Sequence, residues 1–171
     1  MSLLCLILAG GKSIRMGRDK ALLYDSVNQL SQKLTLRGTR IIVACGSPNR
    51  ANLFNSECWF DPADALSLAD VLRAFVQEHD EEIQLFPCDM YNLDDEAIDA
   101  ILAQAPGVPV DQDGRDQFTL ARIPKGTTFS SSSSLKGLFS DFERNQMDFL
   151  DRRLENFNFP TQIDDLNKSN Q

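Results

Sequence analysis

Short apolar runs of three to seven residues alternate along the chain with segments of helical periodicity. Such runs are typical of buried strands in parallel sheets, whereas apolar residues three or four positions apart predict helices with one buried face. The predicted strands are residues 3–8, 40–45, 57–60, 82–86, 108–110 and 118–123. The predicted helices are residues 26–36, 66–79, 94–105, 135–142 and 147–154.

The alternation of strands with helices favours one architecture. It predicts a three-layer α/β/α fold with a mostly parallel, doubly wound, Rossmann-like sheet. The length of 171 residues suits a single domain spanning 1–171. Within it, we expect a flexible serine-rich loop at 131–134 and a frayed tail at 167–171.

Composition narrows the class of protein. Hydrophobic residues make up 42% of the chain and charged residues 25%, which is ordinary for a globular protein. No apolar run approaches the ~20 residues of a membrane span. The four cysteines are scattered without a CxxC pair, and the first apolar run is followed too soon by cations to resemble a signal peptide. We therefore expect a cytoplasmic protein with reduced thiols and no membrane partner.

Charge is distributed unevenly along the chain. The net charge of −8 argues against a nucleic-acid partner. Residues 1–60 contain eight Lys/Arg and three Asp/Glu, a net +5, whereas residues 61–171 contain nine and twenty-two, a net −13. Positive charge thus gathers in the first third, which favours an anionic ligand there.

A glycine-rich turn follows the first predicted strand. Ala9, Gly10 and Gly11 allow a sharp turn and a close approach of the backbone to a ligand. A strand feeding such a turn, with four cations in the next nine residues, predicts phosphate binding through backbone N–H groups and positive charge. The cations are Lys12, Arg15, Arg18 and Lys20.

Two common phosphate-binding motifs do not fit this turn. A Walker A motif would need glycine where the chain has Leu6, and the dinucleotide fingerprint would need glycine where it has Lys12. Instead, residues 8–20 (LAGGKSIRMGRDK) resemble the signature of nucleotidyltransferases that activate sugars and cofactors. Among these, the stretch is most similar to the molybdenum cofactor guanylyltransferases of the MobA type.

A second segment extends the resemblance. Pro87-Cys88-Asp89-Met90 is similar to that family's PCDxPxL segment, whose aspartate binds the metal. Asp89 also follows a predicted parallel strand directly, at the edge where open α/β sheets bind ligands. The polar turn around Gly114, with Asp113 and Arg115, resembles the family's DG segment on the acceptor side.

The resemblance implies transfer of GMP from GTP to molybdopterin cofactor, with Mg²⁺ and release of pyrophosphate. It implies GTP and molybdopterin as partners, and molybdoenzymes or their chaperones as further ones. Arg15 and Lys20 would stabilise the triphosphate, and Asp89 would hold the metal. The nucleotide-binding set implied by the resemblance is Leu8, Ala9, Gly10, Gly11, Lys20, Asp61 and Asp89.

Departures from the family pattern leave alternatives open. Residues 66–70 (LSLAD) replace the family's Gly-Pro-Leu-x-Gly turn, and Ala44 stands where an asparagine is expected near the base. A cytidylyl- or sugar-phosphate nucleotidyltransferase, or a nucleotide-binding homologue that has lost catalysis, fits the same residues. Asp61 also fits an Asp-Pro turn, Asp89 a helix cap, and His79 a helix end.

Overall fold

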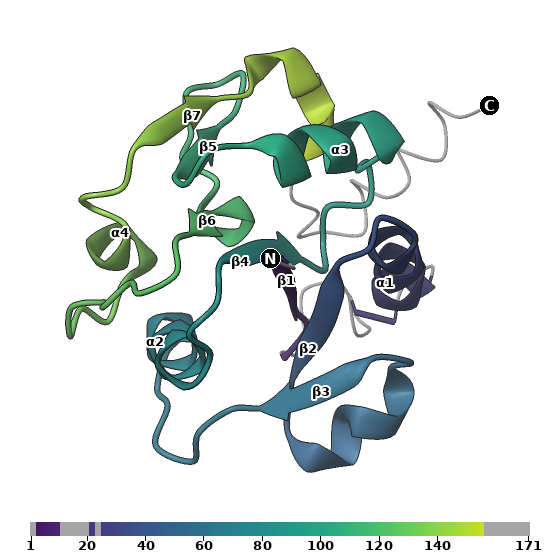
Figure 1. Cartoon of the computed structure of the whole chain (residues 1–171), viewed down its shortest axis with the longest axis vertical. Coiled ribbons are helices and arrows are strands. Elements are labelled where there is room, and N and C mark those ends of the chain that lie inside the picture. Colours follow the sequence, from purple (N-terminus) through teal and green to yellow (C-terminus); the bar gives the residue numbers. More distant parts are fainter. Residues whose placement is uncertain (1–2, 11–20, 23–24, 156–171) are drawn as a thin grey trace.

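The computed structural model describes residues 3–10, 21–22 and 25–155, and Figure 1 shows the arrangement of their elements. The strands are β1 (Leu4–Leu8), β2 (Arg40–Gly46), β3 (Glu57–Phe60), β4 (Ile83–Pro87), β5 (Val108–Val110), β6 (Arg122–Ile123) and β7 (Arg144–Gln146). The α-helices are α1 (Ser26–Leu36), α2 (Leu68–Glu78), α3 (Asp95–Ala103) and α4 (Leu135–Leu138). The 3₁₀ helices are η3 (Pro48–Leu53), η4 (Phe118–Leu120) and η5 (Asp148–Leu154).

The main sheet has five strands in the order β3-β2-β1-β4-β6. Its first four strands are parallel, and β6 pairs with β4 in the antiparallel direction. Leu8, the last residue of β1, pairs with Ala44 on one side and with Pro87 on the other. The carboxyl ends of the three central strands therefore meet at one edge, and the predicted mostly parallel sheet is confirmed.

Helices cover both faces of this sheet because β1 alternates its apolar side chains between them. Cys5 and Ile7 belong to a core shared with α1 and α3, and Leu4 and Leu6 to a core shared with α2 and α4. Figure 1 shows α1 and α3 on one side of the sheet and α2 and α4 on the other. This is the predicted three-layer α/β/α architecture.

The two longer helices after β3 begin at capping side chains. The Ser67 hydroxyl accepts a hydrogen bond from the Asp70 N–H at 3.2 Å, and the Asp94 carboxylate accepts one from the Ala97 N–H at 2.9 Å. Such caps satisfy N–H groups that a helix start leaves without partners. The helix predicted from residue 66 consequently begins at Leu68.

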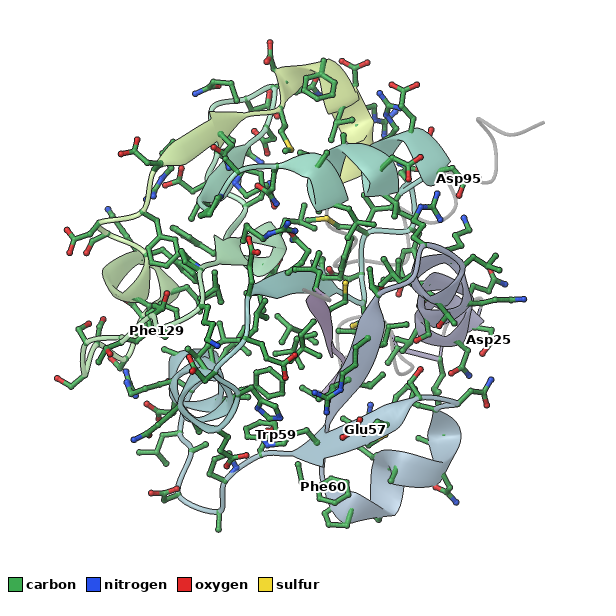
Figure 2. All side chains as sticks on the ribbon, in the orientation of Figure 1. Asp25, Glu57, Trp59, Phe60, Asp95 and Phe129 are labelled. Carbon is green, nitrogen blue, oxygen red and sulfur yellow. The ribbon has the colours of Figure 1, made fainter. Side chains whose placement is uncertain are left out.

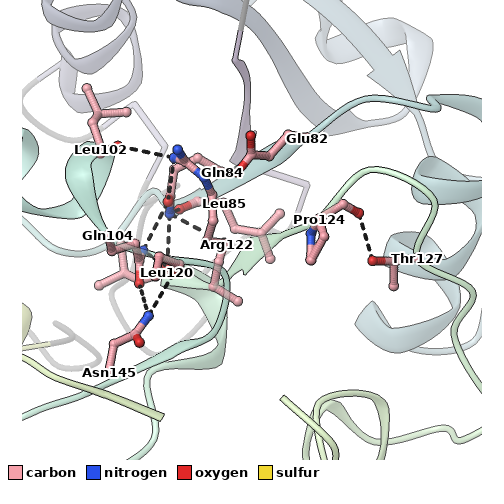
Figure 3. Close-up of polar contacts among 12 residues, drawn as sticks. Glu82, Gln84, Leu85, Leu102, Gln104, Leu120, Arg122, Pro124, Thr127 and Asn145 are labelled. Atoms are coloured by element: carbon pink, nitrogen blue, oxygen red, sulfur yellow. Dashed lines mark hydrogen bonds and ion pairs between the residues drawn. The ribbon is translucent and has the colours of Figure 1, made fainter. Parts of the chain in front are cut away.

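The strand predicted at 118–123 is wrong over its first half. Residues Phe118–Leu120 form η4, and only Arg122–Ile123 pair with β4. Side-chain amides bind the backbone there instead: Gln84 Nε2 and Gln104 Nε2 each donate to the Leu120 carbonyl at 2.9 Å (Figure 3). The glutamines thus replace ladder bonds that a longer strand would make.

The region after residue 124 differs further from the expectation. The helix predicted at 135–142 is one turn, α4; the helix predicted at 147–154 is the 3₁₀ helix η5; and the polar strand β7 was not predicted. The serine-rich loop lacks regular structure, as expected. Arg73 donates to its Ser130 and Ser132 carbonyls, and the ring centroids of Phe129 and Phe139 lie 5.4 Å apart. Figure 2 shows Phe129 on the side of the molecule where α4 lies.

In the described part of the chain, no helix combines the length and the apolar character that crossing a membrane requires. The tail expected at 167–171 lies outside the described residues.

Candidate functional site

A pocket of about 410 Å³ opens at the carboxyl ends of β1 and β2, next to the start of α2. Three of the predicted nucleotide contacts, Leu8, Gly10 and Asp61, line this pocket. Ala44, where the sequence departs from the family pattern, also lines it. The lining residues are Leu8, Gly10, Ala44, Asp61, Ala65, Leu66, Ser67, Leu68 and Val71. The edge of a parallel sheet where strands end is a common ligand site, so this pocket is the candidate nucleotide site.

Ala9, which does not line the pocket, and Gly10, which does, are both held against β2. The Ala9 N–H donates to the Ala44 carbonyl at 2.9 Å, which continues the β1–β2 ladder by one bond. Beyond it, Gly10 and Gly46 pack backbone to backbone, and Gly46 has a φ of +90°. Gly10 therefore serves close backbone packing as well as access to a ligand.

Asp61 stands at the end of β3, on the opposite wall. Its N–H donates to the Gly46 carbonyl at 2.9 Å, which fixes the chain as it leaves the sheet. The residue is exposed overall, yet partial burial of its carboxyl group raises the pKa of Asp61 above its ordinary value. A carboxylate that water solvates poorly is suited to accept hydrogen bonds from a ligand.

Asp89 lies two residues past β4, the strand on the other side of β1. It is half-buried, and its neighbour Cys88 offers a carbonyl that accepts a hydrogen bond from the Ser26 hydroxyl at 3.4 Å. The expected location at the carboxyl edge of the sheet is confirmed; a metal-binding role stays a prediction.

A magnesium ion would fit a single carboxylate at this position. Mg²⁺ is commonly held by one or two carboxylates, with substrate phosphates and water completing its octahedron. Residues 3–10, 21–22 and 25–155 contain no group of three or more His, Cys, Asp or Glu that could hold a metal ion by themselves. Any ion at Asp89 would therefore depend on ligands beyond such a cluster, and a triphosphate supplies them.

The remaining predicted site residues, Gly11, Arg15 and Lys20, lie outside the described residues. Their roles on the phosphates stay predictions.

Arg50 was not among the site residues predicted from the sequence, although it donates to the backbone next to Gly10. Its Nε donates to the Cys45 carbonyl and its Nη2 to the Ala9 carbonyl, both at 2.8 Å. The only signal near it is Pro48, a favourable first residue for a helical turn that brings Arg50 back towards the strand ends.

A second pocket, of about 570 Å³, lies beside the DG segment. Asp111 organises this turn: its Oδ1 accepts from the Asp113 and Arg115 N–H groups, and its Oδ2 from Gln117 Nε2 at 2.7 Å. Arg115 and, from η5, Arg152 are the cations of its lining. The lining also contains five acidic residues: Asp111, Asp113, Asp116, Asp151 and Glu155. The predicted polar turn is confirmed, and it borders a cavity large enough for a substrate.

His79 ends α2 and belongs to neither pocket at this edge. Its ring stacks on Phe75 with 4.0 Å between centroids, and its Nδ1 lies 2.9 Å from the Phe75 carbonyl oxygen. These contacts support the helix-end interpretation, although the side chain is half-buried rather than exposed.

Three solved structures share this fold. The protein Aq1419 from Aquifex aeolicus VF5 is 18% identical with a TM-score of 0.68, and the match covers 91% of this chain and 92% of that one. The bifunctional IspDF from Campylobacter jejuni is 14% identical with a TM-score of 0.63; the match covers 96% of this chain and 54% of IspDF, about half its length. The 4-diphosphocytidyl-2C-methyl-D-erythritolsynthase from Anaerococcus prevotii DSM 20548 is 11% identical with a TM-score of 0.52, covering 99% of this chain and 98% of that chain.

At these identities the likeness concerns the fold. A comparison with curated proteins gave no match. The profile of the MobA-like NTP transferase domain, in contrast, matches residues 5–135, well over half of the chain and all the residues that line the 410 Å³ pocket. The chain therefore belongs to the MobA-like NTP transferase domain family and has the α/β fold of a nucleotidyltransferase.

Proposed function

We propose that the protein transfers GMP from GTP to the terminal phosphate of molybdopterin cofactor, with release of pyrophosphate. One observation carries the proposal: Leu8, Gly10 and Asp61, implied as nucleotide contacts by the sequence, line one 410 Å³ pocket in a chain of the MobA-like family. Asp89 follows the adjacent strand of the same sheet edge.

The base and ribose would occupy this pocket. Leu8, Leu68 and Val71 give it apolar surface, against which a base can bury its faces. Asp61 would accept hydrogen bonds from ring or ribose donors, and the missing side chain of Gly10 lets the nucleotide approach the backbone.

The triphosphate would extend towards Asp89 and the cations of residues 11–20. In the proposed reaction an acceptor phosphate oxygen attacks the α-phosphorus, the bond from this phosphorus to the bridging oxygen breaks, and pyrophosphate leaves with that electron pair. The attacking phosphate is already ionised at neutral pH, so the reaction needs no general base. Arg15 and Lys20 would stabilise the charge on the phosphates, and catalysis would consist mainly of positioning.

Asp89 would hold Mg²⁺, which neutralises phosphate charge when bound. The acceptor would enter from the 570 Å³ pocket, with its phosphate beside Arg115 and Arg152, the two cations among the five acidic residues of the lining. The cysteines of the described residues are free thiols, which fits a reducing compartment such as the cytoplasm. Molybdoenzymes or their chaperones would receive the product.

Cytidylyl transfer is the second candidate, because Ala44 lines the pocket. Its methyl group forms no hydrogen bond with a base, whereas the asparagine expected there has both a donor and an acceptor. Guanine would lose a specific contact, and a smaller pyrimidine would not depend on it.

Calorimetric titration with Mg-GTP, Mg-CTP, Mg-ATP and Mg-UTP separates these candidates. A preference for GTP, followed by pyrophosphate release when molybdopterin cofactor is added, is the expected result. Preference for CTP would replace the guanylyl proposal with the cytidylyl one. Binding without pyrophosphate release, with acceptor present, would indicate a homologue that has lost catalysis, and no binding by the folded protein would refute nucleotide transfer altogether.

A further inference from the structure

Arg50 is buried where a charged side chain is costly. It is 7% exposed, and it is the only buried charged residue among those the structure describes. Burial of a guanidinium group is tolerated only when hydrogen bonds replace its water. The hydrogen bonds of the Arg50 side chain therefore indicate what this buried guanidinium group does.

Arg50 donates to two backbone carbonyls, and both lie where the sheet is interrupted. The register between β2 and β3 shifts between Ala44 and Gly46, so Cys45 has no paired residue on β3, and its carbonyl accepts from Arg50 Nε. The Ala9 carbonyl follows the last bond of the β1–β2 ladder. A regular ladder would continue with the Gly46 N–H donating to it; here Arg50 Nη2 is its donor at 2.8 Å.

The bond to Ala9 also determines where the next N–H points. The Ala9 carbonyl and the Gly10 N–H belong to one planar trans peptide unit, so fixing the carbonyl on one side fixes the N–H on the other. Gly10 lines the 410 Å³ pocket. Because the Ala9 carbonyl is held on the β2 side, the Gly10 N–H faces the other neighbour of β1, which is β4. A backbone N–H held in place there costs a ligand little reorganisation on binding.

The ring of Phe54 also lies next to the Arg50 guanidinium group. The Arg50 Cζ lies 6.0 Å from the centroid of the buried Phe54 ring, within the range of a cation–π contact. The planar fork can bridge two carbonyls while resting near a ring, whereas a lysine ammonium would keep the charge without this geometry.

We propose that Arg50 is a positioning residue for the nucleotide: by holding the Ala9 carbonyl on the β2 side, it directs the Gly10 N–H to the opposite side, towards β4, where the triphosphate would extend to Asp89. This inference rests on the proposed function, because it assumes a nucleotide in the pocket. Arg50 acts through the Ala9–Gly10 peptide.

Arg144 provides a matched control. Its Nη1 also donates to two backbone carbonyls, those of Phe139 and Phe142, and its Cζ lies 5.9 Å from the Phe118 ring centroid. This arginine contacts the chain around α4 and β7, and it does not line the 410 Å³ pocket. Replacing it removes a similar set of backbone bonds, together with an ion pair to Asp116 at 3.0 Å, at a distance from Gly10.

The experiment is calorimetric titration with Mg-GTP of the wild type, Arg50→Lys, Arg50→Met and Arg144→Met, each shown to be folded by circular dichroism. We expect the Kd of both Arg50 variants to rise by about tenfold or more, while Arg144→Met lowers the melting temperature and leaves Kd within about twofold of the wild type. Arg50 variants with wild-type Kd would overturn the inference. If the wild type itself binds neither Mg-GTP nor Mg-CTP, the proposed function fails before any variant is compared.

A measurement on the wild type keeps the inference testable if the Arg50 variants do not fold. In a ¹⁵N-labelled sample, saturating Mg-GTP should shift the Gly10 amide resonance more than that of Gly38, which is outside the pocket. An unmoved Gly10 resonance in a protein that binds the nucleotide would rule out a directed N–H at this position.

Discussion

Gly46 and Gly10 pack so closely that a β-carbon on Gly46 would lie 2.5 Å from the Gly10 carbonyl oxygen. Gly46 also has a φ of +90°, a conformation that residues with side chains rarely adopt. The end of β2 and the pocket wall after β1 are thus in direct backbone contact. A change at Gly46 should reach the nucleotide site through Gly10.

We expect Gly46→Ala to lower both stability and nucleotide affinity. Gly38→Ala is the matched control, because Gly38 has a similar φ of +77° but no atom within 4 Å of the added carbon. The control should cost about 1–2 kcal/mol through backbone strain alone. Urea unfolding should give a clearly larger loss for Gly46→Ala, and titration with Mg-GTP should show weaker binding for it only. Equal losses of stability in the two variants would mean that the backbone contact between Gly46 and Gly10 adjusts to the added carbon without cost.

A second prediction concerns the buried amide network of Figure 3. Gln84 is fully buried; its Nε2 donates to the Leu85 and Leu120 carbonyls, and its Oε1 accepts from Gln104 Nε2 at 3.0 Å. Gln84→Leu would leave Gln104 with fewer partners in a dry interior, at a cost of about 1–3 kcal/mol. Gln77→Leu, at an exposed position of α2, should stay within about 0.5 kcal/mol in the same urea titration. A Gln84→Leu variant as stable as the wild type would show that the network is dispensable.

The central strands of the first half could be predicted because β1, β2 and β4 are buried on both faces. Such strands are continuous apolar runs, and the predicted 3–8 and 40–45 match β1 and β2 closely. The later elements could not be recognised in this way. The strand β7 reads Arg-Asn-Gln, and β6 has two residues, because side-chain amides such as Gln84 replace its ladder bonds. No sequence pattern predicts which distant carbonyl a buried glutamine will donate to.

The residues of the candidate site were likewise predicted only in part. The family resemblance assigned Leu8 and Asp61 to one nucleotide, and the structure brings both to one pocket because the carboxyl ends of parallel strands meet at one edge. Arg50 was missed because its partners are backbone carbonyls, one of them 41 positions away, and carbonyls have no signature in the side-chain sequence.

Two aspartates near the pocket should respond to pH with opposite signs. Burial raises the pKa of Asp61, so the folded state binds its proton more tightly than the unfolded state does. Its contribution to stability therefore falls as pH rises through the window above about 3.9, the ordinary value. The Leu66 N–H, followed by the Arg73 guanidinium, lowers the pKa of Asp70, so Asp70 stabilises the fold above the ordinary value and loses this effect as pH falls.

Asp61→Asn should thus raise the melting temperature at pH 7, whereas Asp70→Asn should lower it. The Asp61→Asn difference from the wild type should shrink as the pH is lowered to about 4, whereas the Asp70→Asn difference should shrink only below about pH 3.9. Scanning calorimetry of the three proteins at several pH values measures this directly. Asp61→Asn should also weaken Mg-GTP binding, because the charged carboxylate that destabilises the fold is the group we assign to the ligand. Equal signs for the two variants would contradict the assigned burial of Asp61.

The last prediction separates metal binding from folding at Asp89. Asp89→Asn keeps the size of the side chain and removes the charge that Mg²⁺ requires. We expect turnover with Mg-GTP and acceptor to fall by at least about a hundredfold, with an unchanged circular dichroism spectrum. Raising the Mg²⁺ concentration should restore part of the loss if the variant binds the ion weakly.

Asp141→Asn is the control, because this exposed aspartate lies in the loop between α4 and β7, outside both pockets. Its turnover should match that of the wild type. Wild-type turnover in Asp89→Asn would remove Asp89 from the metal site and leave it as a turn residue after β4. A variant that loses turnover together with its folded spectrum would assign Asp89 to the fold, because a metal ligand at the open edge of the sheet can lose its charge without unfolding the strands behind it.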